Sequence, residues 1–265
     1  MQQPSNPVAF PPNPLVKMRL KRVPITCDEA HRPSSEEEAY RLQAANNQLL
    51  SQAGLGPIIG HKIGCTTPVM QKFLNIGSPC AGDMFSKSCF PEKAVIKRAD
   101  YLRPGVECEI AVILGNDIPA VGHPPTLASV TNAVGAVMAA IEIVDDRYAD
   151  YRTLGVETLI ADNFFNAGCV LGTPVTDWQK CDLSAIMGRM EINGVPVGEG
   201  SGALVMGHPF EALLWLARSR HARNIGLEKG HVILLGSLVE TRWVNAGDTV
   251  TIQVDQLGDV MLKIQ

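Results

Sequence analysis

Two glutamates separated by one residue are the strongest candidates for chemistry in this chain. They lie in the segment 106–114, in which every second residue from Val106 onward is apolar. This alternation predicts a strand with one apolar face and with Glu107 and Glu109 on the other. Their Cα atoms would lie about 6.6 Å apart, so both side chains could reach one hard cation. A solvated strand face is the alternative interpretation.

A third carboxylate, Glu142, lies inside the apolar run 139–144. A charged carboxylate in such a run is costly to bury unless a positive group lies beside it. That group is either a metal ion or a buried basic residue such as Arg147. Together with Glu107 and Glu109, Glu142 would complete an oxygen-ligand site suited to Mg²⁺ or Mn²⁺.

Two further segments carry groups that could bind an anion. Lys62 lies between two glycines in the segment 60–64, where close approach of other backbone could place its ammonium in a cleft. An exposed strand lysine is the alternative. Gly236, Ser237 and Leu238 follow a candidate strand, and their backbone N–H groups could cradle a carboxylate.

Four other polar residues have both a functional and a structural interpretation. Cys80 and Asp83 lie among small residues, where either could transfer a proton, although no neighbour is expected to lower the pKa of Cys80. Asp162 could bind substrate, but such a residue before a strand usually forms a turn. His208 could bring an imidazole to the site, and a helix start explains it equally well.

The helices and strands that must position these residues are predicted from the placement of Pro, Gly and capping residues and from the periodicity of apolar residues. Seven of the 18 prolines fall before residue 34, so residues 1–33 are predicted to be an extended, poorly packed extension and residues 34–265 a single domain. Ser35 and Glu38 form a predicted capping box that opens a helix to about Ala53.

The remainder predicts short strands with few long helices. The expected elements are a strand over 58–63, a helix from Thr126 to about Met138, a strand over 140–144, a hairpin at Asn193-Gly194, a helix from Pro209 to about Arg223 and three strands within 231–264. Because strands and helices do not alternate regularly, an α+β fold with a mixed sheet is expected.

Composition excludes several classes of protein. The 265 residues include 23 Lys and Arg against 27 Asp and Glu, and a net charge of −4 without a basic stripe argues against a nucleic acid partner. The apolar stretch 133–144 is too short to cross a membrane, and the first thirty residues do not resemble a signal peptide, so we expect a cytoplasmic protein. Seven cysteines without a Cys-x-x-Cys pair predict reduced thiols.

Seven motifs in order resemble the 2-keto-4-pentenoate hydratase and 4-oxalocrotonate decarboxylase family of the fumarylacetoacetate hydrolase superfamily. They are Gly60-His61-Lys62-Ile63-Gly64, Glu107-Cys108-Glu109, Glu142, Ala161-Asp162-Asn163, Gly207-His208-Pro209, Gly236-Ser237-Leu238 and Ala246-Gly247-Asp248. The resemblance implies a mixed β-sheet roll with flanking helices, assembled into a homo-oligomer. It also implies Mg²⁺ or Mn²⁺ on Glu107, Glu109 and Glu142, with Lys62 as the active-site lysine.

The resemblance implies a metal-dependent lyase that acts on a small 2-oxo acid. Hydration of a 2-hydroxypenta-2,4-dienoate in aromatic-compound catabolism is the first expectation. Decarboxylation of a 2-oxo-hexenedioate, C–C hydrolysis of an acylpyruvate and an inactive, 2-oxo-acid-binding oligomer are the alternatives. The chain departs from the hydratase pattern at Cys80, where many members have aspartate, and at Val239-Glu240, where they have Gly-Pro; Asp83 is the candidate replacement as proton carrier.

Overall fold

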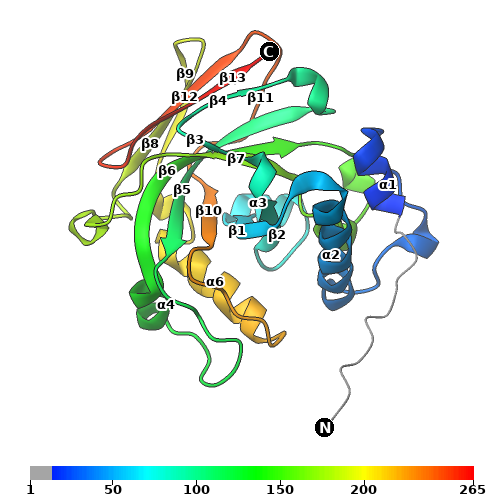
Figure 1. The fold of residues 1–265 in the computed structure, drawn as a ribbon, viewed down its shortest axis with the longest axis horizontal. Helices are drawn as coiled ribbons and strands as arrows, with labels where there is room; N and C mark the ends of the chain where they lie inside the picture. Colours follow the sequence, from blue (N-terminus) through cyan, green and yellow to red (C-terminus); the bar gives the residue numbers. More distant parts are fainter. Residues whose placement is uncertain (1–13) are drawn as a thin grey trace.

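Two sheets and six α-helices make up residues 14–265, the part of the chain described by this computed structural model (Figure 1). The larger sheet has eight strands in the order β2-β1-β10-β5-β6-β7-β3, with β11 paired to β5. The smaller sheet has five, in the order β4-β13-β12-β8-β9. Each sheet contains parallel and antiparallel pairs, which confirms the predicted mixed α+β class.

The bounds of the elements are as follows. The larger sheet contains β1 (Ile58–Gly64), β2 (Cys80–Phe85), β3 (Cys89–Pro91), β5 (Pro104–Leu114), β6 (Val134–Asp145), β7 (Asn166–Leu171), β10 (Val232–Ser237) and β11 (Arg242–Trp243). The smaller contains β4 (Lys93–Ile96), β8 (Met187–Ile192), β9 (Val195–Ser201), β12 (Thr249–Val254) and β13 (Gly258–Ile264). The helices are α1 (Pro14–Lys21), α2 (Glu36–Leu50), α3 (Pro68–Phe73), α4 (Leu127–Ala133), α5 (Val156–Ala161) and α6 (Pro209–His221).

Strands β5 and β6 form the centre of the larger sheet and are buried along almost their whole length. A strand covered on both faces has a continuous apolar sequence instead of an alternating one. The predicted helix from Thr126 to Met138 is therefore wrong in its second half. Thr126 does cap α4, but this helix ends at Ala133 and β6 begins at Val134.

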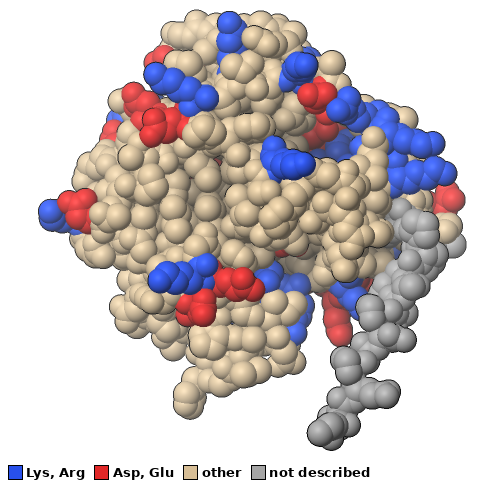
Figure 2. Space-filling view, in the orientation of Figure 1, with Lys and Arg blue, Asp and Glu red and all other residues tan. Residues whose placement is uncertain are grey.

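The N-terminal segment is better packed than its proline content suggests. The prediction of extended chain is wrong for residues 14–21, which form α1 and bury Leu15 and Val16. Ile25 is also fully buried and bridges to Tyr148. Figure 2 shows a group of basic side chains over α1 on the face it draws. The part of the predicted extension before residue 14 lies outside the described residues.

Helix α2 begins as predicted but its capping differs in detail. The Ser35 hydroxyl accepts a hydrogen bond from the Glu38 backbone N–H, as an N-cap should. The Glu38 carboxylate accepts from the backbone and hydroxyl of Ser34, so the reciprocal bond of the predicted capping box is absent at Ser35. The helix ends at Leu50 in a wider π-helical turn, in which Gly54 has a φ of 116°.

Most other predicted elements are confirmed. Strand β1, strand β5, helix α6 and the β8–β9 hairpin lie where the sequence placed them, and Asn193 and Gly194 both have positive φ, as their turn requires. The C-terminal region contains four strands instead of three, because β11 adds two residues to the edge of β5. All seven cysteines are free thiols. No helix within residues 14–265 is long and apolar enough to cross a membrane.

Candidate active site

Three carboxylates converge on one face of the larger sheet. Glu107 on β5 lies directly opposite Glu142 on β6, and Glu109 lies two residues further along β5 on the same face. One oxygen of each carboxylate lies within 4.8 Å of the others. Glu109 and Glu142 are fully buried, whereas Glu107 is partly exposed. The structure thus brings together the three residues that the sequence singled out, and this acidic cluster could hold a metal ion.

The hydrogen bonds of the three carboxylates leave two buried oxygens without a partner. The Gly236 N–H donates to Glu109 Oε2 over 2.9 Å, the Asn166 side-chain amide donates to Glu142 Oε1 over 3.0 Å, and the Thr241 hydroxyl donates to Glu107. Glu109 Oε1 and Glu142 Oε2 accept no hydrogen bond. Buried acceptors without donors are rare, and three oxygen donors around one point fit a hard divalent cation.

Electrostatics supports the same interpretation. Burial, and then the charge of Glu142, raises the pKa of Glu107 to about 7. Burial, followed by Glu142 and Glu107, raises the pKa of Glu109 well above its ordinary value. The cluster as it stands therefore disfavours three negative charges. A bound cation would remove that repulsion and would keep all three carboxylates ionised.

Lys62 lies beside this cluster on strand β1. Its Nζ is 3.2 Å from Glu142 Oε1 and 5.1 Å from the centroid of the Phe164 ring. Burial lowers the pKa of Lys62, but Glu142, Glu107 and Glu109 outweigh that effect and hold the pKa above its ordinary value. The lysine is therefore a buried cation, and the alternative of an exposed strand lysine is wrong. It is also the basic partner of Glu142, a place that the sequence offered to Arg147.

The glycines around Lys62 allow the close approach that the sequence suggested. A Cβ on Gly60 would lie 1.9 Å from the Val232 carbonyl oxygen on the neighbouring strand β10. A Cβ on Gly64 would lie 2.9 Å from the ring of Phe164. Any larger residue at either position would displace the backbone or the ring that packs against Lys62.

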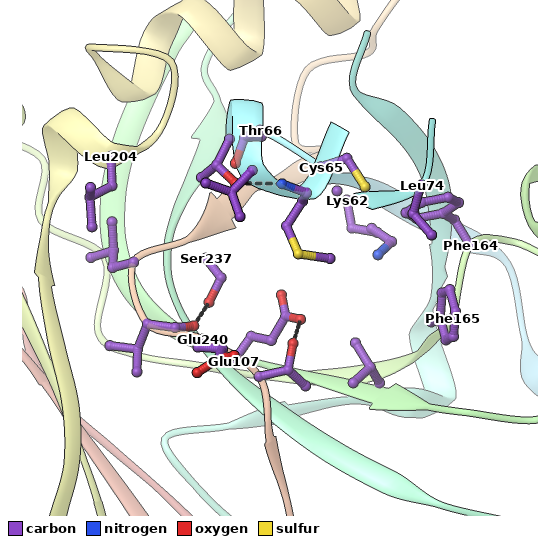
Figure 3. Close-up of a pocket in the computed structure, with 18 of the residues that line it drawn as sticks. Lys62, Cys65, Thr66, Leu74, Glu107, Phe164, Phe165, Leu204, Ser237 and Glu240 are labelled. Atoms are coloured by element: carbon purple, nitrogen blue, oxygen red, sulfur yellow. Dashed lines mark hydrogen bonds between the residues drawn. The ribbon is translucent and has the colours of Figure 1, made fainter. Parts of the chain in front are cut away.

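A cavity of about 430 Å³ opens beside Lys62 and Glu107 (Figure 3). Its described lining residues are Lys62, Gly64, Cys65, Thr66, Thr67, Val69, Met70, Leu74, Glu107, Val144, Tyr151, Phe164, Phe165, Leu204, Ser237, Leu238, Val239, Glu240, Thr241 and Trp243. In Figure 3 the Glu107 carboxylate points into this space, and Lys62 lies across from it. Most of the remaining wall is aliphatic or aromatic, as in typical small-molecule sites.

The C-terminal end of β10, with Leu238 after it, contributes to the site in two ways. Ser237 and Leu238 line the cavity, and the Ser237 hydroxyl donates to the Val239 carbonyl oxygen. The Gly236 N–H points instead at Glu109, so Gly236 orients a carboxylate of the protein. Its φ is 118°, and a Cβ at this position would lie only 2.5 Å from the Thr66 hydroxyl oxygen, so both features require glycine.

Asp83 lies away from the cavity, on the opposite face of strands β1 and β2. It pairs in register with His61, and neighbouring residues of a strand point to opposite faces, so Lys62 and Asp83 are separated by the sheet. Asp83 accepts hydrogen bonds from His61 Nδ1 over 2.7 Å and from the Asn47 amide over 2.9 Å. Asp83 therefore lies outside the cavity that Lys62 and Glu107 line.

The pair His61–Asp83 should make stability depend on pH. Burial lowers the pKa of His61 to about 4, despite its bond to Asp83. The unfolded chain binds a proton near pH ~6.5, so the contribution of neutral His61 is complete above that pH and is lost as the pH falls toward 4. We expect the free energy of unfolding to fall by about 2 kcal/mol over this window, measured by urea titration.

The control for this prediction is His61→Asn, which keeps a donor toward Asp83 but has no titrating ring. Groups that do not contact His61 titrate in both proteins, so the difference between the two pH profiles isolates the His61–Asp83 pair. Identical profiles would contradict the prediction.

Asp162 is also placed outside the cavity, in a buried ion pair. It receives two hydrogen bonds from the Arg147 guanidinium, 2.9 and 3.1 Å long, and a third from the Tyr148 hydroxyl over 3.0 Å. Arg147 also donates to the carbonyl oxygens of Phe165 and Asn166. Asp162 therefore fixes the chain that leads into β7, and the predicted contact with substrate gives way to this structural role.

Asp162→Ala should strongly destabilise the protein. The variant leaves the Arg147 guanidinium buried without its carboxylate, a change that typically costs about 3–5 kcal/mol. Urea denaturation of the purified variant measures the loss. The matched control is Asp150→Ala, which removes an exposed carboxylate from Arg152 and should change stability little. Equal effects of the two substitutions would contradict the prediction.

Three consecutive residues, Asn163 to Phe165, have left-handed backbone with φ values of 68°, 45° and 63°. Non-glycine residues adopt this conformation at a cost that their surroundings must offset. Asn163 exchanges two 2.7 Å hydrogen bonds with the backbone of Asp83, and Arg147 binds the carbonyl at the other end of the segment. The strained segment thereby presents Phe164 and Phe165 to the cavity.

The remaining candidates have structural roles. Cys80 is buried, and burial raises the pKa of its thiol above the ordinary value, which disfavours the thiolate that a nucleophile needs. His208 caps α6, with its Nδ1 accepting from the Phe210 N–H over 3.1 Å. Glu240 lines the mouth of the cavity and lies 3.7 Å from Arg242.

Several functional residues gave little or no signal in the sequence. Asn166 stands before an apolar run and could have been noticed as a polar residue entering a buried strand. Thr241 and Phe164 gave none, because a hydroxyl or a ring becomes informative only when its neighbour is known. The turn that presents Phe164 depends on contacts with Asp83, 80 residues away from Asn163 in the chain.

Comparison with known proteins gives a consistent result. The family model for the C-terminal part of fumarylacetoacetate hydrolase matches residues 84–265. A 2-keto-4-pentenoate hydratase of Burkholderia vietnamiensis is 34% identical over 222 residues, which cover 84% of this chain and 83% of that protein. A 2-hydroxyhexa-2,4-dienoate hydratase of Comamonas testosteroni is 32% identical over 248 residues, covering 93% and 92%.

The fold is also similar to that of a solved enzyme. The structure of 4-oxalocrotonate decarboxylase from Pseudomonas putida G7, complexed with magnesium and adipate, superposes with a TM-score of 0.87 and covers 95% of this chain and 94% of that one. The two sequences are 24% identical, so this likeness concerns the fold.

Proposed function

This chain belongs to the 2-keto-4-pentenoate hydratase and 4-oxalocrotonate decarboxylase family of the fumarylacetoacetate hydrolase superfamily, and from that premise we propose that it is a divalent-metal-dependent hydro-lyase. The reaction is the addition of water to a 2-hydroxypenta-2,4-dienoate-type acid, which gives a 4-hydroxy-2-oxo acid. One observation carries the proposal: three clustered carboxylates, two of them buried with one unpartnered oxygen each, adjoin a buried lysine at the wall of a substrate-sized cavity. The family resemblance supports a place for this step in aromatic-compound catabolism.

Glu107, Glu109 and Glu142 would hold the ion, which we propose to be Mg²⁺ or Mn²⁺. Their donor set is made only of oxygen, which suits these two ions better than softer metals. When bound, the ion would act as a Lewis acid toward the carboxylate and 2-oxygen of the substrate.

The protein's own groups prepare the cavity for an enolate. The Lys62 ammonium, paired with Glu142, would place a positive charge where negative charge develops on the substrate. The Phe164 ring lies with its centroid 5.1 Å from this ammonium. With Cys80 in place of the family's usual aspartate and Asp83 on the other face, Lys62 Nζ is the proton-bearing cation that the described residues place in this cavity.

A substrate panel tests the proposal. The protein is loaded with Mg²⁺ or Mn²⁺ and offered 2-hydroxypenta-2,4-dienoate, a 2-oxo-hexenedioate and an acylpyruvate. Loss of dienol absorbance with formation of 4-hydroxy-2-oxopentanoate is the expected result. Release of carbon dioxide from the hexenedioate without hydration of the dienoate would replace the proposal with decarboxylation, and C–C cleavage of the acylpyruvate alone would replace it with hydrolysis.

We also propose that the protein works in the cytoplasm as a homo-oligomer. The family resemblance supports the assembly, and the seven free thiols fit a reducing compartment. Light scattering after gel filtration measures the assembly directly, and a monomeric mass would contradict it.

Failure to turn over any 2-oxo acid, with retained metal and pyruvate binding, would instead indicate an inactive binding protein.

A further inference from the structure

Apart from Lys62, the described lining of the cavity carries no positive charge. Lys62 itself is held at Glu142 beside the carboxylate cluster. The other charged lining residues, Glu107 and Glu240, are acidic. A second carboxylate on a substrate would therefore meet no second cation in this lining, and a buried charge without a partner is costly.

Two arginines that contact lining residues, Arg103 and Arg242, are engaged with other partners and do not themselves line the cavity. Arg103 stacks on the Trp243 ring at 4.3 Å and bonds Asp146 over 3.3 Å. Arg242 donates to the Val197 carbonyl oxygen over 2.6 Å and lies 3.7 Å from Glu240. Recognition of a distal carboxylate would require one of them to leave these partners.

Apolar side chains form much of the remaining lining. They are Val69, Met70 and Leu74 from the α3 region, Phe164 and Phe165 from the strained turn, and Trp243 from β11. Val69 is 76% exposed, and Met70 and Trp243 are also exposed, so the mouth keeps apolar surface in contact with water. An apolar group lying across it would remove that surface from water.

The aromatic part of this wall is rigid. The ring of Phe165 packs edge-to-face against Tyr148, with centroids 4.9 Å apart, against Tyr151 at 5.6 Å and against Phe164 at 5.7 Å. Its backbone is fixed by Arg147. A wall held in this way binds an apolar group without a large loss of side-chain entropy, because its side chains are already ordered.

The cavity also exceeds a five-carbon substrate in size. Its volume of about 430 Å³ corresponds to roughly fourteen water molecules at ~30 Å³ each. A hydroxypentadienoate has eight non-hydrogen atoms, so space remains beyond its last carbon.

We propose that the apolar part of the cavity receives an uncharged, apolar substituent on the distal carbon of the substrate, in preference to a second carboxylate. The inference rests on the proposed function for the placement of the 2-oxo acid head at the carboxylate cluster. It adds the chemistry of the substrate's distal end. The substrates are longer alkyl- or aryl-substituted hydroxydienoates, and dicarboxylic acids are rejected.

Binding tests this without turnover. Calorimetry with the Mn²⁺-loaded protein compares pyruvate with two eight-carbon acids, 2-oxooctanoate and 2-oxooctanedioate, which differ in a terminal methyl or carboxylate. We expect 2-oxooctanoate to bind at least about tenfold more tightly than either of the others, since each buried methylene contributes up to roughly fourfold. Binding of the dicarboxylic acid as tight as that of the monocarboxylic acid overturns the inference while leaving the proposed function intact. Absence of pyruvate binding overturns both.

A charge placed at the mouth provides the second test. Val69→Arg supplies the missing cation at an exposed position, and it should shift the affinity ratio of dicarboxylic to monocarboxylic acid by at least about tenfold toward the dicarboxylic acid. Val69→Gln adds polarity without charge and should shift the ratio much less. Val195→Arg adds the same charge in the β8–β9 hairpin, outside the cavity. An equal shift from Val195→Arg, or none from Val69→Arg, counts against the inference.

Discussion

Glu109→Gln is expected to lower metal-dependent turnover by about 10³-fold or more, because the Lewis acid contributes several kcal/mol that depend on a complete ligand set. The substitution keeps the shape of the side chain, and an amide oxygen can still accept the bond from the Gly236 N–H. Steady-state kinetics with saturating Mn²⁺ measures the loss. The matched control is Glu191→Gln, the same chemical change at an exposed position on β8.

The same variant should be more stable than the unmodified protein when metal is absent. It removes one of three carboxylates that lie within 4.8 Å of one another, and relief of this repulsion should raise the free energy of unfolding by about 1–3 kcal/mol. Addition of Mn²⁺ should then raise the melting temperature of the unmodified protein and leave that of the variant unchanged. Full activity of the variant would disprove the assignment of Glu109. So would a rise of its melting temperature with Mn²⁺ as large as that of the unmodified protein.

Lys62→Met should reduce kcat by about 10²–10³-fold, the typical effect of removing one preorganised group that faces developing negative charge. Methionine has a similar length and can occupy the space beside the Phe164 ring, so the change removes mainly the charge. Because the lost interaction forms as the enolate develops, kcat should fall more than KM rises. Stopped-flow measurement of the loss of dienol absorbance provides both parameters.

The control for Lys62 is Lys72→Met, an exposed lysine on α3. A second measurement separates catalysis from folding. Without metal, Lys62→Met leaves Glu142 without its ion pair and should lower stability, and Mn²⁺ should restore much of that loss by supplying another cation. A variant that is stable with metal and retains full kcat would exclude Lys62 from the reaction.

The sequence predicted which residues form the site better than it predicted the contacts between them. Glu107 and Glu109 were recognisable because the face of a strand is set by counting residues, a local property. That Glu142 lies opposite Glu107 depends on the register between β5 and β6, and these two residues are 35 positions apart in the chain. For the same reason the sequence left two candidates for the positive group beside Glu142, a metal ion and a buried basic residue such as Arg147. The structure places Lys62 beside Glu142.

Asp83 shows the opposite limit. Its chemistry suited proton transfer, but its pairing with His61 sets it on the far side of the sheet from Lys62. The start of β6 was missed for a related reason: Val134 to Met138 are small and apolar, and only burial between neighbouring strands distinguishes such a run from a helix. Both the placement of Asp83 and the start of β6 are decided only when segments distant in the chain meet.

The pairing of β5 with β6 gives the metal ligands one more property. Eleven residues of β5 face β6, and an irregularity between Ile113 and Leu114 fixes their alignment. A slip of one residue would turn Glu142 to the other face and separate it from Glu107. A chain folded out of alignment could then gain no stability from the ion, whereas a correctly aligned chain would. The cation would in this way favour the native register of β5 and β6, because it stabilises only the alignment that also creates the site.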